Sequence, residues 1–490
     1  MKKLSSRPVS FQALAIIAVF VGFLRALFEY QFFGAGVTIQ VLWFMPYFYF
    51  SIGLVLFVLF HSVIGIDWRR SFGAVAMGVA LGVFPPLIDL AVSGAGANVR
   101  YSYNFFIQPA TYPWLFFGGA AGIPVGEAAS LWMSVAFAGL YAYYMRHSIW
   151  RSLLISAILY VFFHVYLSGI PIATAYMILG KFPDASMAAG SAGHVINAIT
   201  YFFAFWYIGI ALIAYGILRP ILAKLLVKRI LHMLPFCIIT FFGSMISAQP
   251  VVEAVLNSIC LALVFYICAV ENDYFDNLYT EGARATVNKQ DIAFLRIILL
   301  MTVAWLIMLG KLIGLFYLLI YLGAVIYQLP QYRARKYFAA GMKIEGLWGW
   351  LSFTSGTLIT VPKKYDPALL IYGLLAFLGW SLISVLKDLK DLNSDRRAGN
   401  ESIYLYLRKK GVSLRTSHRL ISSLVFAGML VPAVVMMLRG GYAGAATLCI
   451  LDATLLLTLM RRHWFIRFKL QLGIICLYLL ALLYWQSALP

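Results

Sequence analysis

The chain has 490 residues, of which 63% are hydrophobic and only 11% carry a charged side chain. A soluble domain typically has about 25% charged residues, so this composition excludes a protein whose whole surface faces water. Many apolar runs reach the about 20 residues that a helix needs to cross a bilayer. We therefore expect an all-α polytopic membrane protein, whose partners include membrane lipid.

The formal net charge of +20 does not indicate nucleic-acid binding, because the basic residues follow the predicted membrane topology. Six of the 38 Lys and Arg residues fall in loops on one predicted side of the membrane, and two fall inside spans. The other thirty lie on the opposite side, which the positive-inside rule makes cytoplasmic. They occupy the N-terminal tail and the loops 66–72, 146–152, 219–229, 272–291, 330–343, 387–419 and 461–469.

The first half of the chain contains six predicted spans. The first begins after Met-Lys-Lys like a signal peptide, but it contains Arg25 and Glu29 and no small-residue cleavage site follows, so we interpret it as a retained helix. Arg25 and Glu29 are four residues apart, which predicts an intrahelical ion pair. Residues 112–123 fit either a re-entrant segment or an outer loop. The six spans lie near 12–30, 43–65, 72–94, 122–145, 151–170 and 192–218.

A few polar residues fall at or near membrane depth in this half. Asp89 follows Pro85-Pro86, and Glu127 follows a Gly-rich stretch. Two interpretations are open for them, a second functional site or hydrogen bonds between helices. His164 and His194 have no evident ligand partner and are expected to be core residues.

A basic linker, Arg219 to Arg229, divides the chain into a domain of unknown function at 1–220 and a second domain at 221–490. The second domain has organised polar clusters and nine predicted spans. They lie near 230–248, 252–272, 292–310, 312–329, 344–361, 367–387, 418–438, 442–460 and 468–487.

Carboxylates are concentrated in this second domain. Nine of the 18 Asp and Glu residues fall in the windows 271–291 and 388–401, each beginning at the cytoplasmic end of a predicted helix. Carboxylates near a bilayer are costly, so their concentration indicates a functional site.

The spacing of these carboxylates points to a metal. Asp388, Asp391 and Asp395 stand at i, i+3 and i+7, and Asp273 and Asp276 at i and i+3, which places each set on one helix face. Like charges stacked in this way repel unless a divalent cation lies between them. Mg²⁺ typically takes one or two carboxylates together with phosphate oxygens and water, so two such helices predict Mg²⁺ ions on a diphosphate.

Basic residues accompany both clusters and would stabilise charge on a departing diphosphate. Asn272 adds a neutral amide contact. The candidate cations are Arg284 after the first cluster, Arg333, Lys336 and Lys343 in the loop 330–343, and Lys387 and Lys390 within the second cluster.

At these residues the chain resembles the UbiA superfamily of intramembrane prenyltransferases, which have nine transmembrane helices and two cytoplasmic Asp-rich motifs. Asn272-Asp273-Tyr-Phe-Asp276 is similar to the first motif, with Thr280 in place of its last aspartate. Lys387-Asp388-Leu-Lys390-Asp391 through Asp395-Arg-Arg-Ala-Gly399 is similar to the second. The segment from Tyr327 to Lys336 is similar to the family's basic loop between them.

The resemblance covers residues 225–490 and implies a nine-helix prenyltransferase bundle preceded by about six further helices. It implies that the five aspartates hold Mg²⁺ on a prenyl diphosphate, that Tyr327, Asn272 and the basic residues bind the substrate, and that a lipophilic acceptor attacks the allylic cation. The expected location is an integral, multi-pass membrane protein, in the inner membrane if the source is bacterial, with its active site on the cytoplasmic side.

Two other functions stay open. A transporter would place ionisable residues at mid-membrane in several helices, whereas these acids cluster at one edge. A non-catalytic protein that binds prenyl lipids would reflect the loss of the acid at Thr280. The acceptor and the length of the prenyl chain are not readable from the sequence.

Overall fold

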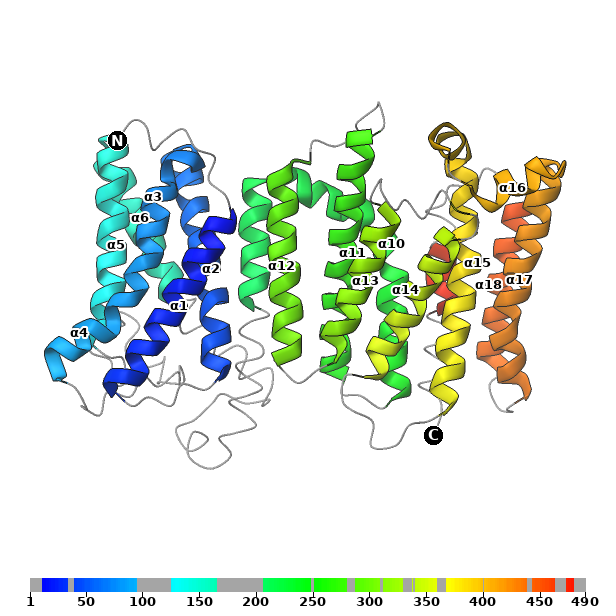
Figure 1. The fold of residues 1–490 in the computed structure, drawn as a ribbon, viewed down its shortest axis with the longest axis horizontal. Coiled ribbons are helices and arrows are strands. Elements are labelled where there is room, and N and C mark those ends of the chain that lie inside the picture. Colours follow the sequence, from blue (N-terminus) through cyan, green and yellow to red (C-terminus); the bar gives the residue numbers. More distant parts are fainter. Residues whose placement is uncertain are drawn as a thin grey trace. The chain divides into compact units, whose positions relative to one another are not determined.

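The structure is a computed structural model, and all of its long elements are helices (Figure 1). It describes residues 11–33, 39–94, 125–164, 206–247, 251–279, 287–308, 312–328, 337, 340–358, 367–399, 401–438, 443–462 and 473–479. The predicted segment 112–123 and His194 lie outside these ranges, as does the side chain of His164. Within the described ranges no strand occurs.

Six of the described helices are long and apolar enough to cross a membrane, which confirms an all-α polytopic membrane protein. They are Gln12–Phe32, Met45–Ile64, Ser71–Ser93, Val125–Arg146, Glu253–Phe275 and Lys289–Ile307. Shorter apolar helices accompany them, and helical residues occupy the position of every predicted span.

The chain forms two compact units. Unit 1 comprises Met1–Pro220 and Lys289–Trp305, and unit 2 comprises Ile221–Asn288 and Leu306–Pro490. The boundary at 220 coincides with the predicted one, but residues 289–305 group with unit 1. The functional assignment of 1–220 and 221–490 stays a prediction.

Unit 1 contains the N-terminal helices together with a helix from the second half of the chain. Its elements are α1 (Phe11–Phe33), α2 (Ile39–Leu59), the π-helical turn η2 (Phe60–Ile64), α3 (Trp68–Ala80), the 3-10 turn η3 (Leu81–Val83), α4 (Phe84–Ser93), α5 (Val125–Arg146), α6 (Ile149–His164), the helix Trp206–Leu218 and most of α12 (Lys289–Met308).

The span predicted at 72–94 is interrupted in the middle, whereas the sequence had predicted one continuous helix. The 3-10 turn Leu81–Val83 separates α3 from α4, and α4 begins with Pro85 and Pro86 in its first turn. Proline has no backbone N–H and its ring crowds the preceding turn, so the helical hydrogen-bond ladder cannot run through this pair. Proline is well accommodated in a first turn, and a new helix therefore starts there.

A buried carboxylate explains why α12 groups with unit 1. Asp291 is 0% exposed and accepts hydrogen bonds from the Arg219 guanidinium at 2.9 and 2.7 Å and from the Tyr215 hydroxyl at 2.7 Å. The Tyr215 ring also stacks on Phe294 of α12 at 3.8 Å between centroids. The ion pair and the ring stack together tie α12 to the helix Trp206–Leu218.

Unit 2 contains the predicted motifs. Its elements are α10 (Pro220–Ile246), α11 (Val251–Tyr279), α13 (Ile313–Gln328), α14 (Ala340–Thr357), α15 (Pro367–Ala398), α16 (Ile403–Lys409), α17 (Leu414–Leu438), α18 (Ala443–Arg462) and the helical residues 473–479. The short helix α16 was not predicted.

The segment predicted as a basic linker is the beginning of a helix. Proline at position 220 fits a first helical turn, because its missing N–H would have no partner there in any helix. Tyr266 of α11 donates a hydrogen bond from its hydroxyl to the Leu222 carbonyl at 2.7 Å, which holds this basic turn against α11. Arg229 is thereby carried on a helix and not on a flexible connection.

Glycines allow α10 and α14 to approach closely. A Cβ atom on Gly356 would lie 2.1 Å from the Thr240 carbonyl oxygen, and one on Gly243 would lie 2.3 Å from the Phe353 carbonyl oxygen. Thr240 also donates its hydroxyl to the Ser352 carbonyl at 2.9 Å. Small residues at membrane helix contacts serve this purpose, because dispersion forces and hydrogen bonds replace the hydrophobic effect there.

One stripe of α13 faces the protein and another faces outward. The buried residues are Tyr317, Ile320, Ala324 and Tyr327. The exposed residues Leu315, Leu319, Leu322 and Ile326 recur at the same helical spacing and are all aliphatic. An exposed aliphatic stripe is stable in lipid but not in water, so this helix lies at the lipid-facing surface of unit 2.

Candidate active site

The Asn272–Asp276 motif lies within a helix. α11 continues to Tyr279, so the motif occupies its last turns, and Asn272 and Asp273 are partly buried. The side chain of Asp276 lies outside the described set. The helical backbone places Asp276 one turn after Asp273, as the spacing predicted.

Asp273 forms an ion pair with Arg229 of α10. One guanidinium nitrogen, Nη2, donates to Asp273 Oδ1, and the two side chains are 23% and 17% exposed. The other carboxylate oxygen, Oδ2, and the Arg229 Nε atom are buried, and neither has a hydrogen-bond partner among the described residues. A buried charged group with an unused oxygen is costly, so this carboxylate is suited to take a further ligand.

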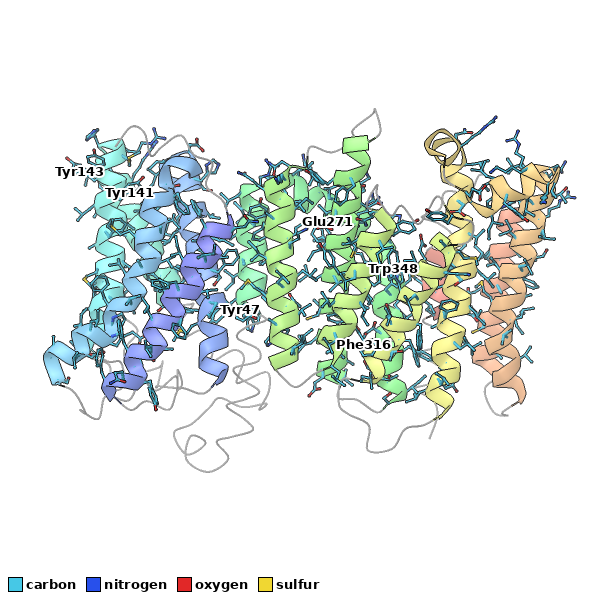
Figure 2. All side chains as sticks on the ribbon, viewed as in Figure 1. Tyr47, Tyr141, Tyr143, Glu271, Phe316 and Trp348 are labelled. Atoms are coloured by element: carbon cyan, nitrogen blue, oxygen red, sulfur yellow. The ribbon has the colours of Figure 1, made fainter. Side chains whose placement is uncertain are left out.

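A second carboxylate is fully buried beside this motif. Glu271 is 1% exposed and accepts a hydrogen bond from the Tyr321 hydroxyl of α13 at 2.9 Å. Figure 2 shows Glu271 nearer one end of the helices than Trp348. Two turns further along α13, the Gln328 amide donates to the Cys268 carbonyl at 2.9 Å, so a second polar contact joins α11 and α13 close to Glu271.

Tyr327, a predicted substrate-binding residue, points into unit 2. Its hydroxyl donates to the Glu345 carboxylate of α14 at 3.2 Å, and both residues are only 9% exposed. Its ring lies 5.7 Å from Trp348, which in turn meets Phe265 at 5.9 Å. Tyr327 is therefore held between a carboxylate and an aromatic cluster.

The second motif lies within α15, which runs without interruption to Ala398. Asp388 is partly buried and Leu392, one turn later, is 8% exposed, whereas Asn393 and Arg396 are exposed. The face of α15 that contains Asp388 and Leu392 therefore points toward the protein. The helical register places Asp391 and Asp395 on or beside this face, although their side chains lie outside the described set.

An aromatic contact relates the two motifs to each other. Phe236 of α10 stacks on Phe265 of α11 at 3.9 Å and lies 4.3 Å from Trp380 of α15. Phe265 and Trp380 each stand eight residues before the first aspartate of their motif, Asp273 and Asp388. The ends of α11 and α15 that carry the motifs lie at the same end of unit 2 (Figure 1), as the predicted topology required.

A buried tyrosine and histidine lie close to the second motif. Tyr404 of α16 is 0% exposed, His418 of α17 is 3% exposed, and the Tyr404 hydroxyl is 3.1 Å from His418 Nδ1. Burial raises the pKa of Tyr404 above its usual range, and the nearby Asp388 carboxylate adds a smaller effect in the same direction. The helix that carries Tyr404 begins with Ser402, whose hydroxyl accepts from the Leu405 N–H at 3.4 Å.

Most of the predicted cations are not described. Lys343 is exposed in the first turn of α14. Arg284, Arg333 and Lys336 lie outside the described residues, as do the side chains of Lys387 and Lys390 on α15. Among the described side chains no cluster of three metal-binding groups occurs, but Asp276, Asp391 and Asp395 are not among them.

The sequence did not single out Arg229, Glu271, Tyr321, Glu345 or Tyr404. Their polar contacts join different helices, so no spacing within one helix reveals them. The presence of Glu271 and Glu345 in or beside predicted spans is the one signal that could have identified them, because carboxylates are rare there.

The sequence matches no family model and no curated protein. Among solved structures, the chain is similar to a UbiA homologue from Archaeoglobus fulgidus bound to DMAPP and Mg²⁺, with 16% identity and a TM-score of 0.40 over 55% of this chain and 99% of that one. It is similar at the same identity and TM-score to a UbiA homologue from that organism bound to Cd²⁺, of which it covers 100%. A digeranylgeranylglyceryl phosphate synthase is similar at 20% identity and a TM-score of 0.39, with 99% of it covered.

Proposed function

We propose that the chain is a Mg²⁺-dependent membrane prenyltransferase, which moves a prenyl group from a prenyl diphosphate to a lipophilic acceptor. The observation that carries this proposal is the pair of acidic motifs at the ends of α11 and α15, on the same end of unit 2. The active site would lie on the cytoplasmic side, to which the basic loops assign these helix ends.

The residues present fit a Mg²⁺ site. Asp273 Oδ2 is buried and has no partner among the described residues, and carboxylate oxygens are the ligands that Mg²⁺ prefers. Asp273, Asp276, Asp388, Asp391 and Asp395 would hold the metal. When bound, Mg²⁺ would neutralise diphosphate charge and make the diphosphate a better leaving group.

Arg229 would bind the diphosphate. It already faces Asp273, and its Nε atom has an unused proton in the part of unit 2 that the structure describes. A guanidinium donates two parallel hydrogen bonds to phosphate oxygens, so Arg229 suits this role better than a lysine would. Asn272, Arg284, Arg333, Lys336, Lys343, Lys387 and Lys390 would supply further donors and positive charge.

The bond between the allylic carbon and the diphosphate oxygen would break with both electrons leaving on the diphosphate. The acceptor would then donate an electron pair to the carbocation and lose a proton. Tyr327 and Trp348 pack against each other in unit 2, and their ring faces would stabilise positive charge.

The test is an assay with membranes that contain the protein, radiolabelled prenyl diphosphates of several lengths, Mg²⁺ and a pool of lipophilic acceptors. We expect a labelled lipid product that Asp391→Ala abolishes. Glu253→Gln is the matched control, because Glu253 lies in the first turn of α11, at the end opposite to Asp273. Equal product from wild type and Asp391→Ala would refute the site. Binding of prenyl diphosphate without product would favour the non-catalytic alternative.

A further inference from the structure

A basic corner joins α16 to α17 in unit 2. It consists of five exposed cations within twelve residues, namely Arg408, Lys409, Lys410, Arg415 and Arg419. We propose that the basic corner binds the phosphate groups of anionic phospholipids in the membrane that surrounds the protein. The proposal does not depend on prenyl transfer.

Hydrogen bonds at the end of α16 fix the shape of the basic corner. Gly411 has a φ of +81°, which glycine adopts without steric strain. Its N–H donates to the Arg408 carbonyl at 3.0 Å. The Val412 N–H donates to the Leu407 carbonyl at 3.0 Å. This pattern is a Schellman motif, in which glycine follows the last residue of a helix, so Arg408 and its neighbours stand on an ordered turn.

The first turn of α17 is ordered as well. The Ser413 hydroxyl accepts the Thr416 N–H at 3.1 Å, and the Ser417 N–H donates to the Ser413 carbonyl at 2.9 Å. A serine at this position supplies an acceptor that the first N–H groups of a helix otherwise lack. Arg415 and Arg419 stand four residues apart on α17, so they share one face. A preformed arrangement of cations of this kind lowers the entropic cost of binding.

The exposed face of α17 changes from charged to aliphatic directly after Arg419. The exposed large side chains that follow are Leu420, Leu424, Val431 and Val434. Such a stripe is stable against hydrocarbon, whereas a charged side chain is stable outside it. The boundary between the lipid tails and the head groups therefore falls next to Arg419, and the basic corner lies at the level of the head-group phosphates.

Acidic residues are scarce around the basic corner. The sequence has no Asp or Glu between Glu401 and Asp452. Within the part of unit 2 that the structure describes, Lys409 is the one cation of the five that forms an ion pair, with Glu401, and its side chain keeps 65% exposure. Lys410 lies over the Tyr406 ring, 5.9 Å from its centroid. The corner thus presents a concentrated positive charge.

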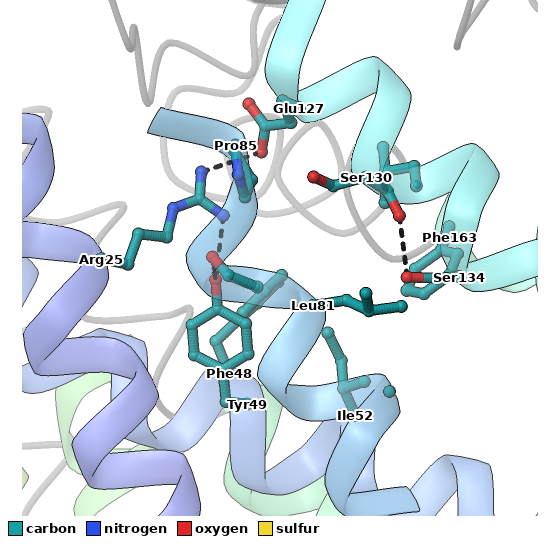
Figure 3. A pocket seen from close by; sticks show the side chains of 13 residues that line it. Arg25, Phe48, Tyr49, Ile52, Leu81, Pro85, Glu127, Ser130, Ser134 and Phe163 are labelled. Atoms are coloured by element: carbon teal, nitrogen blue, oxygen red, sulfur yellow. Dashed lines mark hydrogen bonds and ion pairs between the residues drawn. The ribbon is translucent and has the colours of Figure 1, made fainter. Parts of the chain in front are cut away.

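A buried cation of unit 1 shows the opposite arrangement. Arg25 is 5% exposed, and its Nε donates to Glu29 at 2.7 Å, which confirms the ion pair predicted from their spacing. In a pocket of unit 1, Figure 3 shows its other nitrogens donating to the Tyr49 hydroxyl at 2.9 Å and to Glu127 at 3.3 Å. Carboxylates of the chain itself therefore accompany this guanidinium.

The carboxylates noted in the sequence of unit 1 are engaged within the chain too. Asp89 of α4 accepts the Gly126 N–H of α5 at 2.7 Å, and Glu127 of α5 accepts from Arg25 of α1. Both form hydrogen bonds between helices, as one of the two open interpretations predicted. Charged groups among the apolar helices thus have partners in the fold, whereas four of the five cations of the basic corner rely on their surroundings.

A phospholipid fits these surroundings better than a soluble anion does. Its phosphate can accept parallel hydrogen bonds from Arg415 or Arg419, and its acyl chains can lie along Leu420 and Leu424 of the same helix face. Clusters of Lys and Arg beside a membrane span attract anionic lipids. In phosphatidylcholine the choline group cancels the phosphate charge, so the basic corner should select lipids with a net negative charge, such as phosphatidylglycerol.

Native mass spectrometry of the full-length protein tests this selectivity. The protein is titrated with phosphatidylglycerol and with phosphatidylcholine of the same acyl chains, and we expect phosphatidylglycerol to bind more tightly. The double variant Arg415→Gln, Arg419→Gln should weaken its first binding step by at least about tenfold, because each cation close to an anionic head group contributes roughly fivefold. The matched control Lys224→Gln, Lys228→Gln removes two exposed cations of α10 and should leave this step unchanged.

Hydrogen exchange in nanodiscs locates the bound lipid. We expect the backbone amides of residues 408–417 to exchange more slowly when phosphatidylglycerol is added to phosphatidylcholine discs, and the double variant Arg415→Gln, Arg419→Gln to lose this protection. Arg415→Lys combined with Arg419→Lys keeps both charges and should retain most of it, which covers the case in which the glutamine variant fails to fold.

Three results would overturn the proposal. The first is equal affinity of the wild type for the two lipids. The second is an equal loss of affinity in the double variants of α17 and α10, which would mean diffuse attraction by the whole basic side. The third is displacement of phosphatidylglycerol by inorganic diphosphate, which would mean that the basic corner holds a soluble anion.

Discussion

Arg229 of α10 forms an ion pair with Asp273, the first aspartate of the Asn272–Asp276 motif. The pair places a cation and a predicted metal ligand in direct contact. In the proposed reaction, Asp273 would hold the metal and Arg229 would donate to the diphosphate.

Replacing Arg229 should mainly weaken the binding of prenyl diphosphate. We expect Arg229→Ala to raise the KM for prenyl diphosphate by more than about tenfold, because a charge-assisted contact to a phosphate is lost. Arg229→Lys should recover only part of this, since lysine lacks the planar fork of donors. Steady-state kinetics on membranes would show the effect. The adjacent, exposed Lys228 gives the control Lys228→Ala, and an equal effect of both variants would speak against a specific contact.

Completing the first motif should strengthen metal binding. Thr280 stands seven residues after Asp273, where the resembled motif has its last aspartate. We expect Thr280→Asp to lower the Mg²⁺ concentration at half-maximal activity, and EDTA to abolish activity until Mg²⁺ is restored. Thr280→Asn, similar in size but uncharged, should leave the Mg²⁺ dependence nearly unchanged. An identical response of the two variants would contradict the role of this position.

The Tyr327–Glu345 contact should stabilise unit 2. Tyr327→Phe removes the hydroxyl that donates to Glu345 at 3.2 Å, and the loss of a hydrogen bond to a charged group should lower the free energy of unfolding by about 1.5–3 kcal/mol. Thermal unfolding in detergent measures this cost. A double-mutant cycle with Glu345→Gln isolates the pair, and additive effects of the two substitutions would show that the contact contributes nothing.

Asp291 should be the residue of α12 that contributes most to the stability of unit 1. Asp291→Ala leaves Arg219 and Tyr215 without their acceptor. The loss should be somewhat below the about 3–5 kcal/mol of a fully buried pair, because the Arg219 side chain is 35% exposed. A lower thermal midpoint than that of Asp67→Asn, an exposed acid of the same unit, would confirm it. An unchanged midpoint would contradict it.

Tyr404 predicts a dependence of stability on alkaline pH. Its pKa is raised by burial and by Asp388, so the folded state holds the phenolic proton more tightly than the unfolded state, whose pKa is near 10.0. The stabilisation is therefore complete below pH 10.0 and is lost as the pH rises toward the higher folded value. The thermal midpoint of Tyr404→Phe should fall less steeply between pH 9 and pH 11 than that of the wild type. Parallel midpoint curves for the two proteins would refute this.

The sequence predicted the features that depend on neighbours along the chain. The all-α polytopic membrane architecture follows from the length of the apolar runs and the Arg25–Glu29 pair from i, i+4 spacing, and both are confirmed. Contacts such as Arg229 with Asp273 or Tyr327 with Glu345 depend on which helices pack together, and composition does not encode that. The break at Leu81–Val83 was readable in principle from Pro85 and Pro86, but the apolar run concealed it. That the five aspartates form one catalytic site stays a prediction.

The unbroken length of α15 has a consequence for where the chemistry takes place. At 1.5 Å per residue its 32 residues extend for about 48 Å, which exceeds the about 30 Å hydrocarbon thickness of a bilayer. The apolar part of this helix is Tyr372–Val385, so we expect the surplus at the end that carries Asp388, Asp391 and Asp395. These turns would then lie at the level of the lipid head groups, where ions and diphosphate are hydrated, while the rest of the helix crosses the hydrocarbon. A prenyl diphosphate could be bound there at its charged end while its prenyl chain stays in the membrane.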